Sequence, residues 1–230
     1  MLARPDSVLN NSAQADEVLE LMHQLMGYRN QEIRHRLQEV GKAASMLHLD
    51  VLFLVYHFAK VAQGSILEIG SYIGGSTIAA AFGARESVTP KKIISIEPGG
   101  QVKDHRLASR NIFKDLKKNL ARFGVLESVI LFNGYSFEKT TTSAIRQMLA
   151  QGEVGLFIFD ADGNVRRDLD CYGDLLADGC WLVIDDYGGP SGNAKVAPIR
   201  AQVDELVSAG RLVTFGYYGW GTWIGQWRRI

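Results

Sequence analysis

A glycine-rich turn follows the first short apolar run of the chain: LEIGSYIGGST, residues 67–77. Glycines at such a position allow a tight turn from strand to helix and let the backbone approach a ligand closely. The spacing of Gly70, Gly74 and Gly75 departs from the G-x-G-x-x-G pattern of dinucleotide sites, and no Gly-Lys-Ser/Thr ending indicates a P-loop. Glu68 precedes the first glycine by two residues, which favours a cationic or zwitterionic ligand. A turn that serves only tight helix packing remains the alternative.

Apolar runs and helical stretches alternate along the chain after this turn. The further runs are KKIISIEP, SVILFNG, VGLFIFDAD and CWLVIDDY. Short, continuously apolar strands separated by helices are typical of a parallel sheet that is buried on both faces. Two last strands, RLVTFGYY and GTWIGQWRR, predict an antiparallel hairpin at the sheet edge. The sequence therefore predicts an α/β fold with a doubly wound, mostly parallel, seven-stranded sheet.

Additional helices are predicted before the first strand. Apolar residues recur at helical spacing over about 18–26, a charged helical stretch covers 31–40, and a third helix covers about 43–62. No other feature of this part of the chain indicates chemistry.

The composition excludes several classes of protein. The 230 residues carry 25 basic and 25 acidic side chains, and 47% are apolar. A disordered chain would be less apolar, and a nucleic-acid binder would carry a basic excess. Cys171 and Cys180 are too few for a disulfide framework, so we expect reduced thiols. The N-terminus has no apolar signal core, and no apolar run reaches the roughly 18 residues of a membrane span. We therefore expect a soluble, cytoplasmic protein that binds neither membranes nor nucleic acid.

Acidic residues and glycines follow the predicted strands. Ligands of open α/β sheets bind outside the carboxyl ends of the strands, where these residues would gather. Glu97, at the end of the second predicted strand, could accept hydrogen bonds from both hydroxyls of a ribose. The residues at the other strand ends are Glu68, Gly70, Gly134, Tyr135, Ser136, Asp160, Asp162, Asp185 and Asp186.

Five motifs in a fixed order, LEIGSYIGGST, SIEP, NGYS, FDAD and VIDDY, carry a family resemblance. Over about residues 60–190 the chain resembles the class I S-adenosylmethionine-dependent O-methyltransferases. The most similar pattern is that of the metal-dependent catechol and caffeoyl-CoA group and its natural-product relatives. The resemblance implies methyl transfer from S-adenosylmethionine to a hydroxyl of a small molecule. The cofactor-binding residues that it implies are Glu68, Gly70, Ser71, Tyr72, Gly74, Ser76, Glu97, Gly134, Tyr135, Ser136, Asp160 and Asp162.

Four aspartates follow two predicted strands that are expected to be neighbours. Such strands lie roughly 4.8 Å apart, so the carboxylates would raise one another's pKa unless a cation sat among them. Mg²⁺ or a similar divalent ion, which prefers oxygen ligands, meets that need. The resemblance assigns Asp160, Asp185 and Asp186 as metal ligands, Asp160 as the catalytic residue, and Asp162 to the cofactor. Asp162 could instead cap the helix that begins near Val165.

The expected general base is missing. Catechol-type relatives have a lysine one to three residues after the first metal aspartate, whereas residues 161–164 here are Ala-Asp-Gly-Asn. Arg166 and Arg167 follow, but arginine stays protonated. The metal could suffice, or a histidine could act, the candidates being His23, His35, His48, His57 and His105. The acceptor therefore stays open between a catechol, a sugar or polyketide hydroxyl, and another small molecule.

The resemblance also implies roles for the flanking segments. In such proteins the helices before the core form a lid or a dimer interface, so we expect this of residues 1–62, with residues 63–230 forming the cofactor-binding domain. A homodimer or higher homo-oligomer is expected. The loop 187–193 borders the acceptor or is a plain connector, and strand pairing explains the hairpin aromatics better than substrate stacking does. The alternatives are a nicotinamide-dependent oxidoreductase and a non-catalytic cofactor-binding module.

Overall fold

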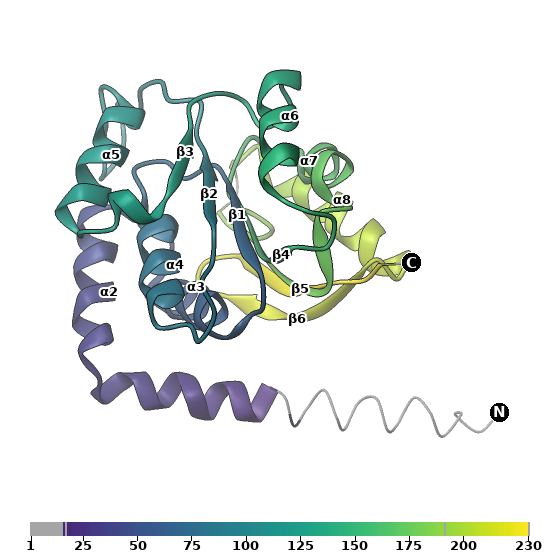
Figure 1. Cartoon of the computed structure of the whole chain (residues 1–230), viewed down its shortest axis with the longest axis horizontal. Coiled ribbons are helices and arrows are strands. Elements are labelled where there is room, and N and C mark those ends of the chain that lie inside the picture. Colours follow the sequence, from purple (N-terminus) through teal and green to yellow (C-terminus); the bar gives the residue numbers. More distant parts are fainter. Residues whose placement is uncertain (1–15, 17, 191, 230) are drawn as a thin grey trace.

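A seven-stranded sheet runs through the molecule (Figure 1), with the strand order β3-β2-β1-β4-β5-β7-β6. The computed structural model describes residues 16, 18–190 and 192–229, so residues 1–15, where the predicted N-terminal segment begins, lie outside the described residues. The strands are β1 (Ser65–Ile69), β2 (Ile93–Ile96), β3 (Ile130–Phe132), β4 (Val154–Phe159), β5 (Leu176–Ile184), β6 (Leu212–Tyr218) and β7 (Thr222–Trp227).

The sheet is doubly wound about its first strand. β1 pairs in parallel with β2 on one side and with β4 on the other, and β5 continues the parallel part beyond β4. β7 pairs antiparallel with both β5 and β6, which closes the sheet with a hairpin at its edge. The predicted α/β fold with a mostly parallel sheet is therefore confirmed. The reversal between β1 and β4 places a ligand crevice at the carboxyl ends of these strands.

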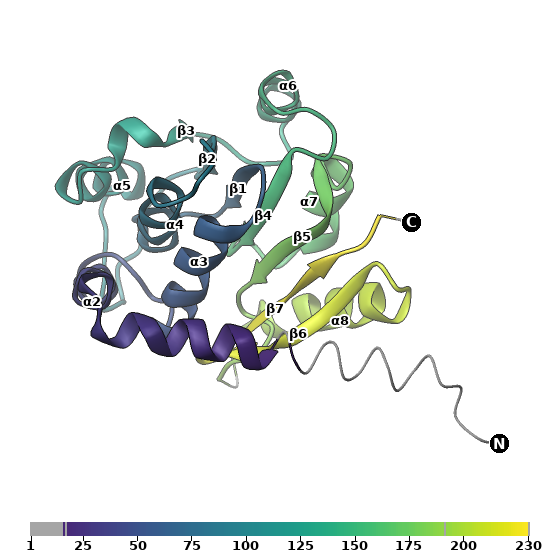
Figure 2. The same cartoon turned by 60° about the horizontal axis from the view of Figure 1, so that its bottom comes forward.

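Helices cover both faces of the sheet, as Figures 1 and 2 show. Side chains alternate along each strand: Ile66 and Leu156 belong to one apolar core, and Leu67 and Phe157 belong to the other. α3, α4 and α5 contribute to the first core, and α6, α7 and α8 to the second. The helices are α2 (Glu32–Ala43), α3 (Leu49–Val61), α4 (Gly75–Arg85), α5 (Ile112–Arg122), α6 (Lys139–Met148), α7 (Val165–Tyr172) and α8 (Val196–Ser208).

The helices before the sheet pack into the same core as α4. Leu37 of α2 and Val51 of α3 are fully buried there, and residues 18–27 form a further helix that contributes Leu21. Within the described ranges, no helix combines the length and the apolar character needed to cross a membrane. Both cysteines are free thiols, as expected.

One predicted helix begins later than the sequence indicates. The third helix is predicted over about 43–62, but Ala43 still belongs to α2, residues 44–48 form a turn, and α3 begins only at Leu49. The apolar pattern runs through this turn, because Leu47 is buried although it is not helical. The periodicity therefore misplaces the boundary between the two helices.

A distant arginine satisfies the end of α2. The guanidinium of Arg106 donates to the carbonyls of Gly41, Lys42 and Ser45 at 3.3, 3.3 and 2.6 Å. The last carbonyls of a helix have no partner within the helix, and an arginine supplies one here. Arg106 lies in the loop after β2, so this contact fastens that loop to the turn 44–48.

Candidate functional site

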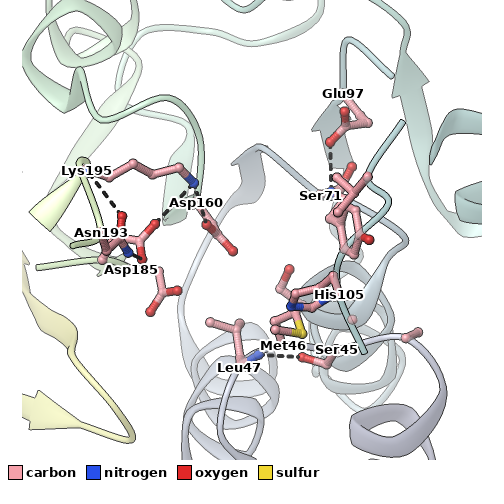
Figure 3. A pocket seen from close by; sticks show the side chains of 16 residues that line it. Ser45, Met46, Leu47, Ser71, Glu97, His105, Asp160, Asp185, Asn193 and Lys195 are labelled. Carbon is pink, nitrogen blue, oxygen red and sulfur yellow. Dashed lines mark hydrogen bonds and ion pairs between the residues drawn. The ribbon is translucent and has the colours of Figure 1, made fainter. Parts of the chain in front are cut away.

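A cavity of about 390 Å³ opens at the carboxyl ends of β1, β2, β4 and β5 (Figure 3). A second cavity of about 240 Å³ adjoins it, because Glu97 and Asp160 line both. The predicted residues that line the large cavity are Ser71, Tyr72, Ser76, Glu97, Asp160, Asp185 and Asp186. Those that line the second are Gly70, Tyr135, Ser136, Glu97, Asp160 and Asp162. Glu68, Gly74 and Gly134 line neither of these two cavities.

The glycines of the β1–α4 turn are required by the packing of the protein on itself. Gly70 has φ +85°, and a Cβ there would lie 2.0 Å from the carbonyl oxygen of Asp160. Gly74, which precedes α4, has φ +100°, and its Cβ would lie 2.9 Å from Leu116 Cδ1. Gly70 is therefore needed because its backbone lies close to the end of β4, whereas the sequence predicted a close approach to a ligand.

Glu68 lies beneath the turn rather than on the cavity wall. Its buried carboxylate accepts from the hydroxyls of Ser76 and Thr77 at 2.5 Å each and from Ser95 at 2.8 Å. Burial outweighs these three donors and raises the pKa of Glu68. Glu68 thus ties β1 to α4 and β2. Direct contact with the methionyl part, which the resemblance implies, is not favoured by this position.

Glu97 lies buried at the end of β2, where the chain crosses the top of the sheet. Its carboxylate accepts from the backbone N–H groups of Tyr72 and Gly99, at 2.8 Å each. Burial raises the pKa of Glu97, although both N–H donors act in the opposite direction. Tyr72 adopts φ 49°, and its hydroxyl donates to the carbonyl of Leu107. These contacts hold the glycine turn and the loop after β2 together around the cavity.

Ser71 carries an unused donor on the cavity wall. Its hydroxyl is buried and has no hydrogen-bond partner among the residues that the structure describes. Figure 3 shows Ser71 beside Glu97, across the cavity from Asp160 and Asp185. A buried polar atom without a partner costs free energy, so this hydroxyl is suited to a polar ligand group.

The second cavity is bordered by an arginine network. Arg167 donates to both carboxylate oxygens of Asp162 at 2.8 and 3.1 Å, and its guanidinium lies 3.9 Å over the ring of Phe137. The Ser136 hydroxyl donates to the buried Asp168, so it points away from the cavity. Asp162 does not cap α7, because Asn164 does so by accepting from the Arg167 N–H.

Three aspartates meet at the opposite wall of the large cavity. Carboxylate oxygens of Asp160, Asp185 and Asp186 lie within 4.8 Å of one another. Burial and the charge of Asp185 raise the pKa of Asp160 well above its ordinary value. Burial likewise raises the pKa of Asp185, although Thr222 donates to this carboxylate at 2.5 Å. Asp186 adopts φ 57°, a backbone conformation that residues other than glycine rarely adopt.

Sequence reasoning missed Lys195, the residue before α8. Its Nζ lies 3.1 Å from Asp186 Oδ2 and 3.9 Å from Asp160 Oδ1. Burial disfavours its charge, but Asp160 and Asp186 outweigh burial and raise the pKa of Lys195. The family pattern points only to the residues directly after Asp160, so it does not reveal a lysine at position 195. Lys195 stands two residues after the loop 187–193, a predicted border of the acceptor site.

The histidines that the sequence offers as bases are dispersed. Arg166, which stays protonated, pairs with Glu205 of α8 at 3.1 Å. His57 is buried against the Tyr28 hydroxyl at 2.8 Å and lines neither of the two cavities described above. His105 lines the large cavity, and His48 lines a third cavity beside the aspartates.

This third cavity, of about 220 Å³, lies beyond Asp185 and Asp186. Met46, His48 and Trp220 contribute to it, and so do Gly188, Gly189 and Pro190 of the loop 187–193, whose Ser191 lies outside the described residues. Trp220 is 70% exposed, whereas Trp223 and Trp227 of the same hairpin are buried. Strand packing therefore explains two of these tryptophans but not Trp220.

Comparisons with known proteins agree with this arrangement. A sequence model described as a methyltransferase domain matches residues 67–187, just over half of the chain. No curated protein matches the sequence.

Solved structures resemble the chain over most of its length. Cofactor-bound Rv0187 from MTB is 20% identical, with a TM-score of 0.60, over 84% of this chain and 87% of that one. The O-methyltransferase TomG from Streptomyces achromogenes, in complex with S-adenosylmethionine, is 16% identical over 87% and 91%, with a TM-score of 0.59. An O-methyltransferase from Bacillus cereus in complex with SAH is 15% identical over 94% and 91%, with a TM-score of 0.58. At these identities the likeness concerns the fold, and the matched sequence family completes the assignment: the chain belongs to the methyltransferase domain family.

Proposed function

We propose that this protein transfers the methyl group of S-adenosylmethionine to a hydroxyl oxygen of a small molecule, assisted by a divalent cation. One observation carries the proposal: Glu97 and Asp160 line two adjoining cavities, and Asp160 also belongs to a cluster of three carboxylates. A cofactor extended across both cavities would pass directly in front of this cluster. The neighbours named above in complex with S-adenosylmethionine and with SAH support the choice of cofactor for this fold.

The residues present fit S-adenosylmethionine. Each Glu97 oxygen already accepts one backbone N–H and retains a lone pair for a ribose hydroxyl. The Ser71 hydroxyl, which has no partner among the described residues, can bond the methionyl carboxylate or amine. The aromatic and guanidinium groups around the second cavity, Phe137 and Arg167, are suited to the face of an adenine. The ribose hydroxyls would thus meet a carboxylate, the methionyl group would meet a hydroxyl, and the planar adenine would meet an aromatic ring and a guanidinium group.

The three aspartates fit a hard divalent cation. Their oxygens converge within 4.8 Å, and carboxylates are the protein ligands that Mg²⁺ prefers. When bound, such a cation supplies Lewis acidity, which lowers the pKa of a coordinated hydroxyl and fixes its orientation. The chain's own contribution is to hold Asp185 through Thr222 and Asp186 through Asn193, whose side-chain amide donates at 2.7 Å.

The turn 44–48 contributes by excluding water. Ser45, Met46 and Leu47 line the large cavity from the side opposite the sheet. A dry surrounding favours methyl transfer from a sulfonium, because the positive charge of the cofactor disappears in that step. The turn 44–48 would also help to hold the methyl donor and the acceptor oxygen in line at short distance. The third cavity, beside the aspartates, is our candidate for the acceptor.

Cofactor choice is tested by isothermal titration of the protein with S-adenosylhomocysteine and, separately, with NAD⁺. We expect binding of the first only. Glu97→Gln should weaken that binding by about 1.5–3 kcal/mol, because it replaces a charged acceptor. Glu127→Gln, an exposed residue of a short helix before β3, is the matched control. Equal affinities in the wild type and Glu97→Gln would contradict the placement of the ribose.

Turnover is tested by incubating the protein with S-adenosylmethionine, Mg²⁺ and a library of hydroxylated metabolites, with mass spectrometry as the readout. A product heavier by one methylene group identifies the acceptor, and Asp160→Ala should abolish its formation. Turnover that persists in excess chelator would remove the cation from the mechanism. Cofactor binding without any turnover would favour a non-catalytic binding module.

A further inference from the structure

Lys195 holds an oxygen that a divalent cation would need. The side-chain amide of Asn193 donates to Asp186 Oδ1 at 2.7 Å, and the Lys195 ammonium lies 3.1 Å from Asp186 Oδ2. The orientation of the Asn193 amide follows from its other contact, because its oxygen accepts from the Lys195 backbone N–H at 3.0 Å. Asn193 thus engages one oxygen of this carboxylate, and Lys195 engages the other, Oδ2, for which a metal would have to compete.

The same ammonium faces a second member of the cluster. Its Nζ lies 3.9 Å from Asp160 Oδ1, and Figure 3 shows the Lys195 side chain reaching toward Asp160. Asp185 is the exception, since its Oδ1 accepts from Thr222. The single charge of Lys195 thus partly balances the charges of the three carboxylates.

From this geometry we propose that Lys195 is a built-in cation that competes with the divalent ion for the aspartate cluster. The ammonium holds Asp186 and Asp160 while no ion is bound, and it withdraws when an ion takes Asp186 Oδ2. This inference rests on the cation site of the proposed function and adds a regulator of its affinity. It assigns a role to a residue that the positions of the family motifs do not include.

Lys195 has room to withdraw. Its side chain is 40% exposed, and four rotatable bonds allow the ammonium to swing into solvent without movement of the backbone. Its backbone, in contrast, is fixed by the Asn193 contact and by the start of α8. The competitor is therefore tethered next to the site, so it acts at a high and constant effective concentration.

The proposal is tested by titrating Mn²⁺ into the purified full-length protein, with calorimetry as the readout. Lys195→Gln removes the charge and should bind Mn²⁺ about ten- to a hundredfold more tightly than the wild type, as expected for a charge within about 4 Å. Lys195→Arg keeps the charge and should resemble the wild type. Lys118→Gln changes the net charge equally on the exposed side of α5 and should also resemble the wild type.

The outcomes separate the two proposals. Mn²⁺ binding of equal affinity in all four proteins overturns the competition and leaves the cation site intact. Absence of Mn²⁺ binding in every protein overturns both the competition and the metal part of the proposed function. Binding of S-adenosylhomocysteine, measured in parallel, shows that each variant is folded.

A second measurement uses the wild type alone. Acetic anhydride modifies free lysine amines, and peptide mass spectrometry reports the extent of acetylation at each lysine. If Mn²⁺ releases the Lys195 ammonium from Asp186, acetylation of Lys195 should increase when Mn²⁺ is added, while that of Lys118 should not change. An unchanged or reduced acetylation of Lys195 would overturn the proposal.

Discussion

The proposed cofactor side and the proposed acceptor side of the candidate site are built in different ways. The cofactor side comes from strand ends that are neighbours in the sheet, and its turn spans residues 67–77 without interruption. The acceptor side combines the turn 44–48, Asn193 and Lys195, and the hairpin residue Trp220. These segments are far apart in sequence, and none of them lies in a strand. Strand pairing positions the first side, whereas contacts between loops position the second.

Substitutions should therefore affect stability on the first side and specificity on the second. On the cofactor side, a change at the turn disturbs the pairing of β1 with β4, because Gly70 touches the end of β4. On the acceptor side, an exposed residue such as Trp220 can change while the sheet stays intact.

The largest effect is expected from Gly70→Ala. A Cβ at this position would lie 2.0 Å from a backbone oxygen at φ +85°, so we expect a loss of about 3 kcal/mol or more in the free energy of unfolding. Gly100→Ala is the matched control, since Gly100 has φ +98° but no atom within 4 Å. It should lose only about 1–2 kcal/mol from backbone strain. Urea unfolding measures both, and equal losses would show that Gly70 is not a packing requirement.

Arg106→Ala comes next, because Arg106 joins the two sides. Its three hydrogen bonds to the end of α2 would be lost, and we expect a decrease of about 1.5–3 kcal/mol in unfolding free energy. Binding of S-adenosylhomocysteine should also weaken, because the turn 44–48 would be released from the cavity. Arg110→Ala, an exposed residue of the same loop, serves as the control. Unchanged affinity with reduced stability would limit Arg106 to a structural role.

Acid should lower the free energy of unfolding through His57, which lies on α3. Burial lowers the pKa of His57 on α3 to about 4, below its ordinary value of 6.5. The unfolded state therefore binds a proton at a higher pH than the folded state, so stability falls as the pH decreases from 6.5 toward 4. Between pH 7 and 5 the loss from this group is about 1–2 kcal/mol. Urea unfolding at both pH values should show a smaller loss for His57→Gln; the same loss would assign the acid sensitivity elsewhere.

The smallest effect on stability is expected from Trp220→Ala. Its side chain is 70% exposed, so unfolding free energy should change by no more than about 0.5 kcal/mol. Binding of S-adenosylhomocysteine should not change, whereas the KM of the acceptor found by mass shift should rise. A weakened cofactor affinity would mean that the two sides are not independent.

The sequence predicted the cofactor side more completely than the acceptor side. The parallel strands were recognisable because most of their residues are apolar, and Glu97 was recognisable because it follows one of them. The approach of Asp160, Asp185 and Asp186 followed from the parallel pairing of β4 with β5. Chain direction and strand order thus suffice for this part of the site.

The remaining features depend on contacts that sequence patterns do not encode. The end of α2 is set by Arg106, more than sixty residues later, so helical periodicity could not reveal the turn 44–48. Lys195 reaches the aspartates through a loop whose course the sequence does not specify. The position of Glu68 before the glycines predicts contact with a ligand, but three hydroxyl groups hold its carboxylate beneath the glycine turn.

The contact between Gly188 and Gly221 bears on how the acceptor range of this protein can be altered. The Gly188 N–H donates to the Gly221 carbonyl at 2.8 Å, and a Cβ on Gly221 would lie 2.3 Å from the Gly188 backbone. Two main chains in direct contact form a rim that cannot widen by exchange of side chains. A laboratory programme that seeks bulkier acceptors should therefore leave both glycines unchanged and diversify Met46, His48 and Trp220. These three positions offer replaceable side chains around the same opening.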